Sequence, residues 1–329
     1  MVMVKRNFFL AISTVVLLVF TTVYPVVILV HGTIAPHKHA VKSKVEWWLP
    51  GGEFFENLSQ QAYVRGHVVV PFTWSGIPRV ADMEQGGIIL ARIIASYAVN
   101  EPVIVVAHSH GGNVFMKALQ ELHHSFRKQI PALSAITVEK CIEQVLASYN
   151  VQRQHSVTSA LSLLPAPQPS GFDLLPTARA GILLDAWKEN STFTLQAKKR
   201  QFLVDEVYLL GTPINEKNFY PQTELVGQLF NIYSEGDAVQ PAGFILAYGT
   251  LSDRKFNQRA KIANIELFVR EKDKKKLAVV GHSALHSPIV GEWLFHCSEY
   301  VNAMKSGWHG AGIDARLALD WEKGPIYCG

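Results

Sequence analysis

Short apolar runs recur along this chain, and each one ends in a glycine or in a group of polar residues. Their length and their β-branched content are typical of strands buried on both faces of a parallel sheet. A polar-faced stretch with helical spacing, roughly Asp82 to Ala98, separates two of the runs, and this alternation predicts right-handed crossovers. The pattern therefore predicts an α/β fold with a mostly parallel sheet. The predicted strands are Val26 to Val30, His67 to Phe72, Val103 to Val106, Glu206 to Leu210, Leu229 to Tyr233 and Leu277 to Val280.

One serine stands at the end of an apolar run and is followed by glycines. The stretch from Glu101 to Phe115 reads EPVIVVAHSHGGNVF and places Ser109 just beyond a predicted strand. A strand that turns sharply into a helix leaves no room for side chains two positions before and after the serine, which gives the nucleophile-elbow pattern G-x-S-x-G. Here the pattern is A-x-S-x-G, because Ala107 replaces the first glycine. Ser109 is the predicted nucleophile, and a helix N-cap without chemistry is the simpler alternative.

Two titratable residues follow later predicted strands. Asp237 comes after the run that ends in NIYS, and His282 comes after the run LAVV and one glycine. A serine hydroxyl is a poor nucleophile at neutral pH, so it needs a base to take its proton and a carboxylate to orient that base. Asp237 and His282 are the predicted acid and base. Glu235 remains an alternative acid and His286 an alternative base, because each lies on the same short turn as its rival.

Several short motifs carry a resemblance to a known family. The chain contains the stretches HGT, FTWSG, AHSHGGN, LGTP, YSEGDAVQ and GHSALHSP. Together they resemble those of α/β-hydrolase fold serine esterases and lipases, in particular the bacterial lipase-like members. The order Ser109, Asp237, His282 is the nucleophile, acid and base order of that family. The resemblance runs from about Val26 to Leu294, and it departs from the family pattern at Ala107 and in a long insert.

The resemblance implies a fold, a site and a reaction. The fold is a mostly parallel sheet with helices on both faces and an inserted helical cap. The site is a triad of Ser109, Asp237 and His282, with an oxyanion hole made by the backbone N–H groups of Thr33 and His110. The reaction is hydrolysis of carboxylic esters, lipids among them, through an acyl-enzyme that needs no cofactor. A thioesterase or acyltransferase using the same triad, and a catalytically idle hydrolase-like binding protein, are the alternatives.

The connection between the helix after Ser109 and the strand at Glu206 is about eighty residues long, far longer than an ordinary αβ connection. Ser134 to Tyr149 has helical spacing, whereas Pro165 to Pro176 is rich in proline and breaks that pattern. We expect a cap inserted at about 127–203 of a hydrolase domain that spans 26–329. Such a cap either shields the sheet or gates the substrate.

The N-terminus is apolar behind a short basic start. Lys5 and Arg6 precede a stretch without formal charge from Asn7 to Val30. This layout predicts a signal peptide or membrane anchor over residues 1–25, and hence an exported or membrane-associated protein. The segment is at the short limit for a membrane span, and no A-x-A cleavage site precedes Pro25. A buried first element in a cytoplasmic protein is the lesser alternative.

Composition narrows the choice of partner. The 329 residues include 31 basic and 27 acidic side chains, so the net charge is +4. This charge is too slight to indicate nucleic-acid binding, and no basic stripe interleaved with aromatics is present. The expected partner is a neutral ester or lipid substrate, with membrane association through the N-terminus.

Histidine and cysteine spacing gives no support for a metal site. His31, His37 and His39 cluster in the sequence, but no carboxylate or cysteine accompanies them at ligand spacing. Cysteines occur only at 141, 297 and 328, which is not a zinc pattern. Whether Cys297 and Cys328 form a disulfide or remain free thiols stays open at this point.

Overall fold

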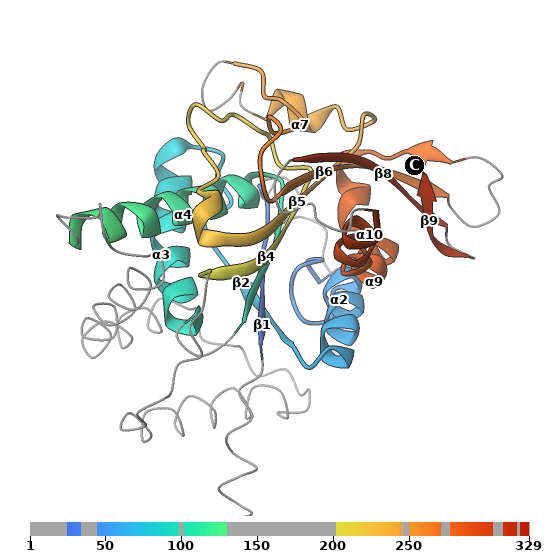
Figure 1. Ribbon diagram of the computed structural model, residues 1–329, viewed down its shortest axis with the longest axis horizontal. Coiled ribbons are helices and arrows are strands. Elements are labelled where there is room, and N and C mark those ends of the chain that lie inside the picture. The colour runs from blue at the N-terminus through green and yellow to red at the C-terminus, as the bar shows by residue number, and fades with distance from the viewer. Residues whose placement is uncertain are drawn as a thin grey trace, which may run out of the picture.

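The computed structural model describes residues 25–33, 45–98, 102–129, 202–243, 245, 250–270, 277–304, 312–320 and 323–328. Within these ranges a nine-stranded sheet runs through the centre of the molecule, with helices on either side (Figure 1). The spatial order is β2-β1-β3-β4-β5-β6-β8-β9, and β7 pairs with β6. The strands are β1 (Val26–Val30), β2 (Val68–Phe72), β3 (Val103–His108), β4 (Val204–Leu210), β5 (Val226–Tyr233), β6 (Ile262–Arg270), β7 (Ala278–Val279), β8 (Ile313–Asp320) and β9 (Gly324–Cys328).

The sheet is mostly parallel, so this part of the sequence prediction is confirmed. Strands β1 to β6 and β8 pair in parallel, whereas β7 and β9 are antiparallel to their neighbours. Strand β1 lies between β2 and β3, so the direction in which the chain crosses the sheet reverses there. In open α/β sheets, ligands bind beyond the carboxyl ends of the strands at such a switch point. Thr33 follows β1 and Ser109 follows β3 at this position.

Helices cover both faces of the sheet. Figure 1 shows α3 and α4 on one side and α2, α9 and α10 on the other. Two separate hydrophobic cores form beneath these two layers. The helical elements are α2 (Glu53–Val64), α3 (Val80–Ala98), α4 (His110–Gln129), η2 (Thr223–Leu225), α7 (Val239–Ala242), η3 (His282–His286), α9 (Pro288–Trp293) and α10 (His296–Met304).

Strand β1 is apolar at every position and is buried on both faces. Successive side chains of a strand point to opposite faces, and both faces of this strand are covered. Val26, Ile28 and Val30 belong to the core beneath α3 and α4. Val27 and Leu29 belong to the core beneath α2, α9 and α10. All five residues are buried, so no position on the strand tolerates a polar side chain without a partner.

The strand predicted from Leu277 to Val280 is wrong in extent. The structure has only the two-residue β7 there, antiparallel to β6. The long strand of this region is β6, which the apolar-run criterion missed because Asn264 and Glu266 interrupt it. Both polar side chains are buried but have partners, since Asn264 donates to Asp314 and Glu266 accepts from Arg316. Strand β8 was missed because its residues alternate between buried and exposed along its first half.

Two of the predicted regions fall largely outside the described residues. The expected cap at 127–203 is described only at its two ends, 127–129 and 202–203, and the expected signal peptide or anchor at 1–25 only at Pro25. His37 and His39 also lie outside. Among the helices of the described ranges, none combines the length and the apolar character needed to cross a bilayer.

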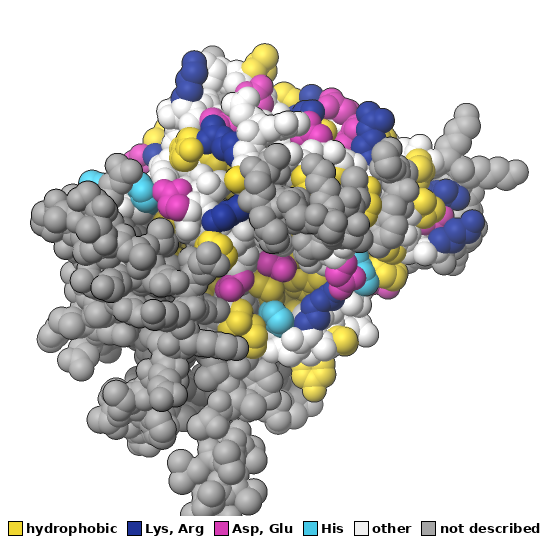
Figure 2. All heavy atoms as spheres, viewed as in Figure 1, with side chains coloured by type: hydrophobic (Ala, Val, Ile, Leu, Met, Phe, Trp, Pro, Cys, Tyr) yellow, Lys and Arg dark blue, Asp and Glu magenta, His cyan; other side chains and the backbone are white. Residues whose placement is uncertain are grey.

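On the face drawn in Figure 2, Lys and Arg side chains are interspersed with Asp and Glu side chains across the described surface.

Candidate active site

Ser109 occupies a strained turn between β3 and α4. Its φ angle is 54°, and Lys261 is the only other non-glycine residue in the described ranges with a positive φ. Left-handed backbone is costly for a residue with a side chain, and such strain concentrates at functional sites. The Ser109 N–H donates to the Leu210 carbonyl at 2.8 Å, and the Ser109 carbonyl accepts from Gly112 N–H at 3.0 Å. The sharp turn expected of a nucleophile elbow is therefore present at this serine.

The glycines around Ser109 are required by close packing. A Cβ atom at Gly111 would collide with the backbone carbonyl of His31, and one at Gly112 would collide with the side chain of Thr212. A Cβ atom at Gly32 would lie 2.7 Å from the Cβ of Ser109, so the loop after β1 lies directly against the serine. Ala107 stands where the elbow pattern has glycine, and its methyl group is buried in the core beneath α3 and α4.

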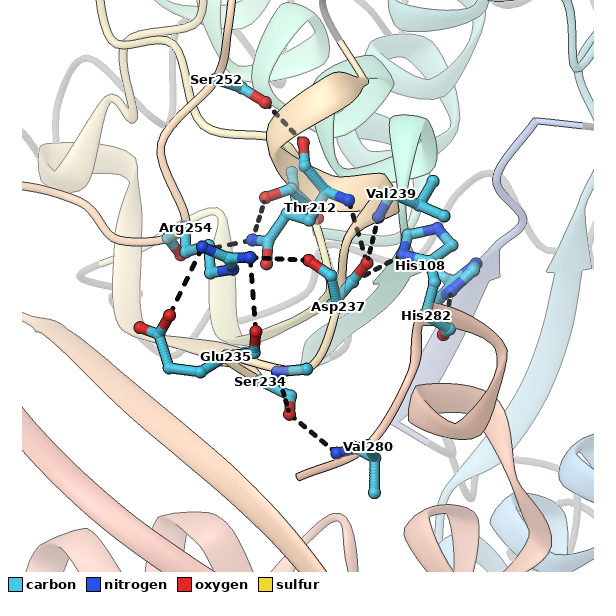
Figure 3. Close-up of polar contacts among 12 residues, drawn as sticks. His108, Thr212, Ser234, Glu235, Asp237, Val239, Ser252, Arg254, Val280 and His282 are labelled. Carbon is cyan, nitrogen blue, oxygen red and sulfur yellow. Dashed lines mark hydrogen bonds and ion pairs between the residues drawn. The ribbon is translucent and has the colours of Figure 1, made fainter. Parts of the chain in front are cut away.

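Asp237 and His282 form a buried hydrogen-bonded pair. Figure 3 shows the Asp237 carboxylate between the imidazole of His282 and the backbone of Val239. Its Oδ2 lies 2.7 Å from Nδ1 of His282, and its Oδ1 accepts the N–H groups of Val239 and Gln240 at 2.9 Å each. Asp237 is completely buried. A carboxylate accepts, so Nδ1 of a neutral His282 carries the proton and Nε2 is left as the basic nitrogen.

Glu235, the alternative acid, makes a different contact. Its carboxylate is more than half exposed and pairs with Arg254 at 3.4 Å. The same guanidinium donates to the backbone carbonyl of Asp237 at 2.9 Å, so Arg254 holds the turn that carries both acids (Figure 3). The structure thus brings Asp237, and not Glu235, to the His282 imidazole. Sequence reasoning missed Arg254 because it lies in no recognisable motif.

The serine turn and the acid–base pair meet at Leu210 and Gly211. Leu210 accepts the Ser109 N–H, and the next residue, Gly211, lies against the pair. A Cβ atom at Gly211 would be 3.0 Å from Oδ2 of Asp237 and 3.2 Å from Nδ1 of His282. The end of β4 therefore joins the two halves of the predicted triad at the carboxyl edge of the sheet.

His286, the alternative base, lies in an aromatic cluster. Its ring stacks on Trp47 with centroids 4.4 Å apart and meets the ring of His108 edge-on at 4.6 Å. His108 also contacts His282, with ring centroids 4.6 Å apart, and its Nε2–H donates to the His282 carbonyl at 3.3 Å. Of the two histidines on η3, the structure brings His282 to the buried carboxylate. His108 therefore supports the backbone of that turn.

The two predicted oxyanion residues touch each other. Thr33 Oγ1 lies 2.9 Å from Nδ1 of His110, and Nε2 of His110 lies 3.0 Å from the Gly243 carbonyl. His110 is the first residue of α4, where the backbone N–H groups point out of the helix end. These donors and the helix dipole favour negative charge at this point.

Three histidines at this edge are buried and neutral. Burial lowers the pKa of His31 and of His110 to about 4, and it lowers the pKa of His108 well below 6.5. The neighbouring histidines lower the pKa of His108 further. His31 is stacked between Trp48 and Trp74, with centroids at 4.2 and 5.7 Å. Such an imidazole supports the walls of the site and has no role as a base at neutral pH.

The remaining candidates are a metal site and the cysteine thiols. Within the described ranges, His, Cys, Asp and Glu side chains form no group of three with the geometry of a metal site. His31 is enclosed by the two tryptophans, and Cys297 is a free buried thiol whose pKa burial raises to about 12.

Comparisons of this chain with protein-family models, with curated proteins and with solved structures found no match.

Proposed function

We propose that this protein is a serine hydrolase of the α/β-hydrolase fold that cleaves carboxylic esters, lipids among them. One observation carries the proposal: a completely buried Asp237 bonds to His282 at the same sheet edge at which Ser109 adopts a left-handed turn. A buried carboxylate on one imidazole nitrogen leaves the other nitrogen free to take a proton, which is the arrangement that activates a serine.

The proposed reaction has two halves. Ser109 Oγ attacks the ester carbonyl while His282 Nε2 takes its proton, and the oxyanion accepts the N–H groups of Thr33 and His110. The tetrahedral intermediate collapses to an acyl-enzyme, and His282 returns the proton to the leaving alcohol. Water then repeats the sequence, releasing the acid and restoring Ser109. Asp237 holds the imidazole in place and stabilises the imidazolium that forms.

The charge around the site supports a neutral substrate. His31, His108 and His110 stay uncharged at neutral pH because burial lowers their pKa values. The net charge of the chain is only +4, and charges of both signs are mixed over the face shown in Figure 2. Neither observation favours a nucleic acid or a polyanion. An uncharged acyl ester meets no strong field that opposes it.

Labelling with a fluorophosphonate tests the nucleophile directly, because the probe reacts only with an activated serine. We expect wild-type protein to be labelled at Ser109 and Ser109→Ala to be unlabelled. Ser283→Ala is the matched control, since Ser283 is an exposed serine beside His282. The Ser109→Ala variant should also lose aryl-ester hydrolysis by on the order of 10³-fold or more while remaining folded.

Two results distinguish the alternatives. An unlabelled and inactive wild-type protein indicates an idle hydrolase-like binding protein. A Ser109-dependent activity that is much faster on acyl thioesters than on matched oxyesters, or that transfers the acyl group to an added alcohol, indicates a thioesterase or an acyltransferase. A series of ester chain lengths measured in the same assay assigns the acyl preference.

A further inference from the structure

We propose that the His110 imidazole is a positioning residue that joins the Thr33 hydroxyl to the serine turn and thereby holds the two oxyanion-binding N–H groups in register. The inference rests on the proposed function, since an oxyanion forms only if Ser109 attacks an acyl group. It assigns a role to two side chains that the oxyanion hole, made of backbone groups, does not itself require.

The contact bridges parts of the chain that are far apart in sequence. Thr33 and His110 are separated by 77 residues, and His110 and Gly243 by 133. The imidazole bonds to both, at 2.9 Å to Thr33 Oγ1 and at 3.0 Å to the Gly243 carbonyl. One ring therefore connects the loop after β1, the start of α4 and the end of α7. Of these segments, the loop after β1 lies against Ser109 at Gly32, and α4 begins directly after Ser109.

The proton positions follow from the partners. The Gly243 carbonyl can only accept, so Nε2 of His110 carries a proton and donates it. The pKa of His110 is lowered to about 4 by burial, so at neutral pH the ring holds one proton. Nδ1 is then an acceptor, and the Thr33 hydroxyl donates to it. The direction of the Thr33 side chain is thereby defined, and with it the backbone of the loop that lies against Ser109 at Gly32.

The hydroxyl of Thr33 is poorly suited to a purely structural role. Thr33 is exposed, whereas His31 and Gly32 before it are buried. Its hydroxyl nevertheless bonds to the buried imidazole of His110, so its loss should lower the free energy of unfolding modestly, while the Thr33 N–H loses its fixed position. Small displacements of groups that contact the transition state have large kinetic effects.

Thr33→Val tests the idea because it keeps the backbone N–H and removes only the hydroxyl. With a simple aryl ester we expect kcat to fall about tenfold, less than the hundredfold or more that loss of a whole oxyanion donor costs. We expect KM to stay almost unchanged and the melting temperature to fall only slightly, so that the variant is fully folded in the assay. An arylboronic acid forms a tetrahedral adduct with a negative oxygen, so its inhibition constant should rise by the same factor as kcat falls.

Conservative and control variants separate positioning from packing. Thr33→Ser keeps the hydroxyl and should restore most of kcat. His110→Phe keeps the backbone N–H but removes both ring contacts, whereas His110→Gln keeps a donor and an acceptor and should lose less. The double variant Thr33→Val, His110→Phe should be no slower than His110→Phe alone, because the hydrogen bond that Thr33→Val removes is already absent in His110→Phe. Thr223 is a half-buried threonine that precedes β5, at the amino end of the strand and not at its carboxyl end. Thr223→Val should therefore behave as wild type.

The outcomes distinguish this inference from the function on which it rests. An active wild-type protein in which Thr33→Val keeps full kcat and full boronate affinity overturns the positioning role alone. So does a Thr33→Val loss that Thr33→Ser fails to restore, or additive losses in the double variant. A wild-type protein that neither hydrolyses esters nor labels at Ser109 overturns the proposed function and this inference together. A Thr33→Val protein that is partly unfolded at the assay temperature, to the extent that kcat is lost, indicates packing and also overturns this inference.

Discussion

Asp237 Oδ2 lies 2.7 Å from Nδ1 of His282, although the two residues are 45 positions apart in the chain. The pair is held from both sides. The Asp237 carboxylate accepts two backbone N–H groups at the start of α7, and Arg254 bonds to the Asp237 carbonyl. On the other side, the backbone of His282 is held by His108. An acid oriented in this way can keep one imidazole tautomer in place through a catalytic cycle.

Asp237→Asn should reduce kcat for an aryl ester on the order of 10³- to 10⁴-fold, because an amide favours the wrong imidazole tautomer. Glu235→Gln is the matched control, since Glu235 pairs with Arg254 and not with His282. Its kcat should stay within about threefold of wild type, as expected for loss of an exposed ion pair. Steady-state kinetics on both variants measures this. A large loss in Glu235→Gln with a small loss in Asp237→Asn would move the acid to Glu235.

His282→Ala should lose as much activity as Ser109→Ala, whereas His286→Ala should lose far less. His282 bonds to the buried carboxylate, and His286 stacks on Trp47. A shared unit loses most of its effect when any one member is removed. Parallel measurement of kcat and of fluorophosphonate labelling in the two variants checks this. The reverse ranking would place the base at His286 and leave the mechanism unchanged.

Gly112→Ala should destabilise the fold by about 1 to 3 kcal/mol, because the new methyl group collides with the side chain of Thr212. Gly281→Ala is the control. Gly281 has an extended backbone with φ −78°, and a Cβ atom there meets no heavy atom within 4 Å. Urea denaturation of the two variants decides the matter. Equal midpoints for Gly112→Ala and Gly281→Ala would show that α4 shifts at little cost.

Stability should fall as the pH is lowered from neutrality toward 4. The pKa values of His31 and His110 are about 4 in the folded protein and 6.5 in the unfolded chain. Between these values the unfolded chain binds more protons, so the free energy of unfolding decreases as the pH falls. At pH 5 the loss is about 2 kcal/mol for each of these histidines. Urea denaturation at pH 7 and pH 5 measures it, and His110→Gln should lose less than wild type. Equal free energies at both pH values contradict this prediction.

We propose that residues 1–25 direct export or membrane attachment, because Lys5 and Arg6 precede a stretch without formal charge. The full chain should then be found in the membrane or the exported fraction. A shortened protein that begins at Pro25 should stay soluble and active, because it retains β1 and Thr33. Cell fractionation with an esterase assay tests both statements. A full chain found wholly in the cytosol, with a shortened protein that does not fold, would refute the proposal.

The sequence alone located much of the sheet and the polar residues that follow the carboxyl ends of its strands. Val26 to Val30 and Val103 to Val106 are apolar at every position because both faces of their strands are covered, and this leaves an unbroken run that is visible in the sequence. Ser109 could be recognised from the sequence because Gly111 and Gly112, which the sharp turn requires, lie only two and three positions after it. Strand β6 was missed because Asn264 and Glu266 interrupt its apolar run, and the partners of these buried side chains are known only from the packed structure. Strand β8 was missed because it has no long apolar run, although its alternation of apolar and polar residues is itself a strand pattern.

Choices between neighbours on a single turn were decided only by the tertiary structure. Asp237 and Glu235, like His282 and His286, have the same chemistry and almost the same position in the sequence, so no local pattern separates them. Packing separates them, because one member of each pair is directed into the site and the other toward Arg254 or Trp47. The contact of Thr33 with His110 is likewise invisible in the sequence, since it arises from the adjacency of β1 and β3. The sequence determines which groups follow each strand, and the order of strands in the sheet determines which of them meet.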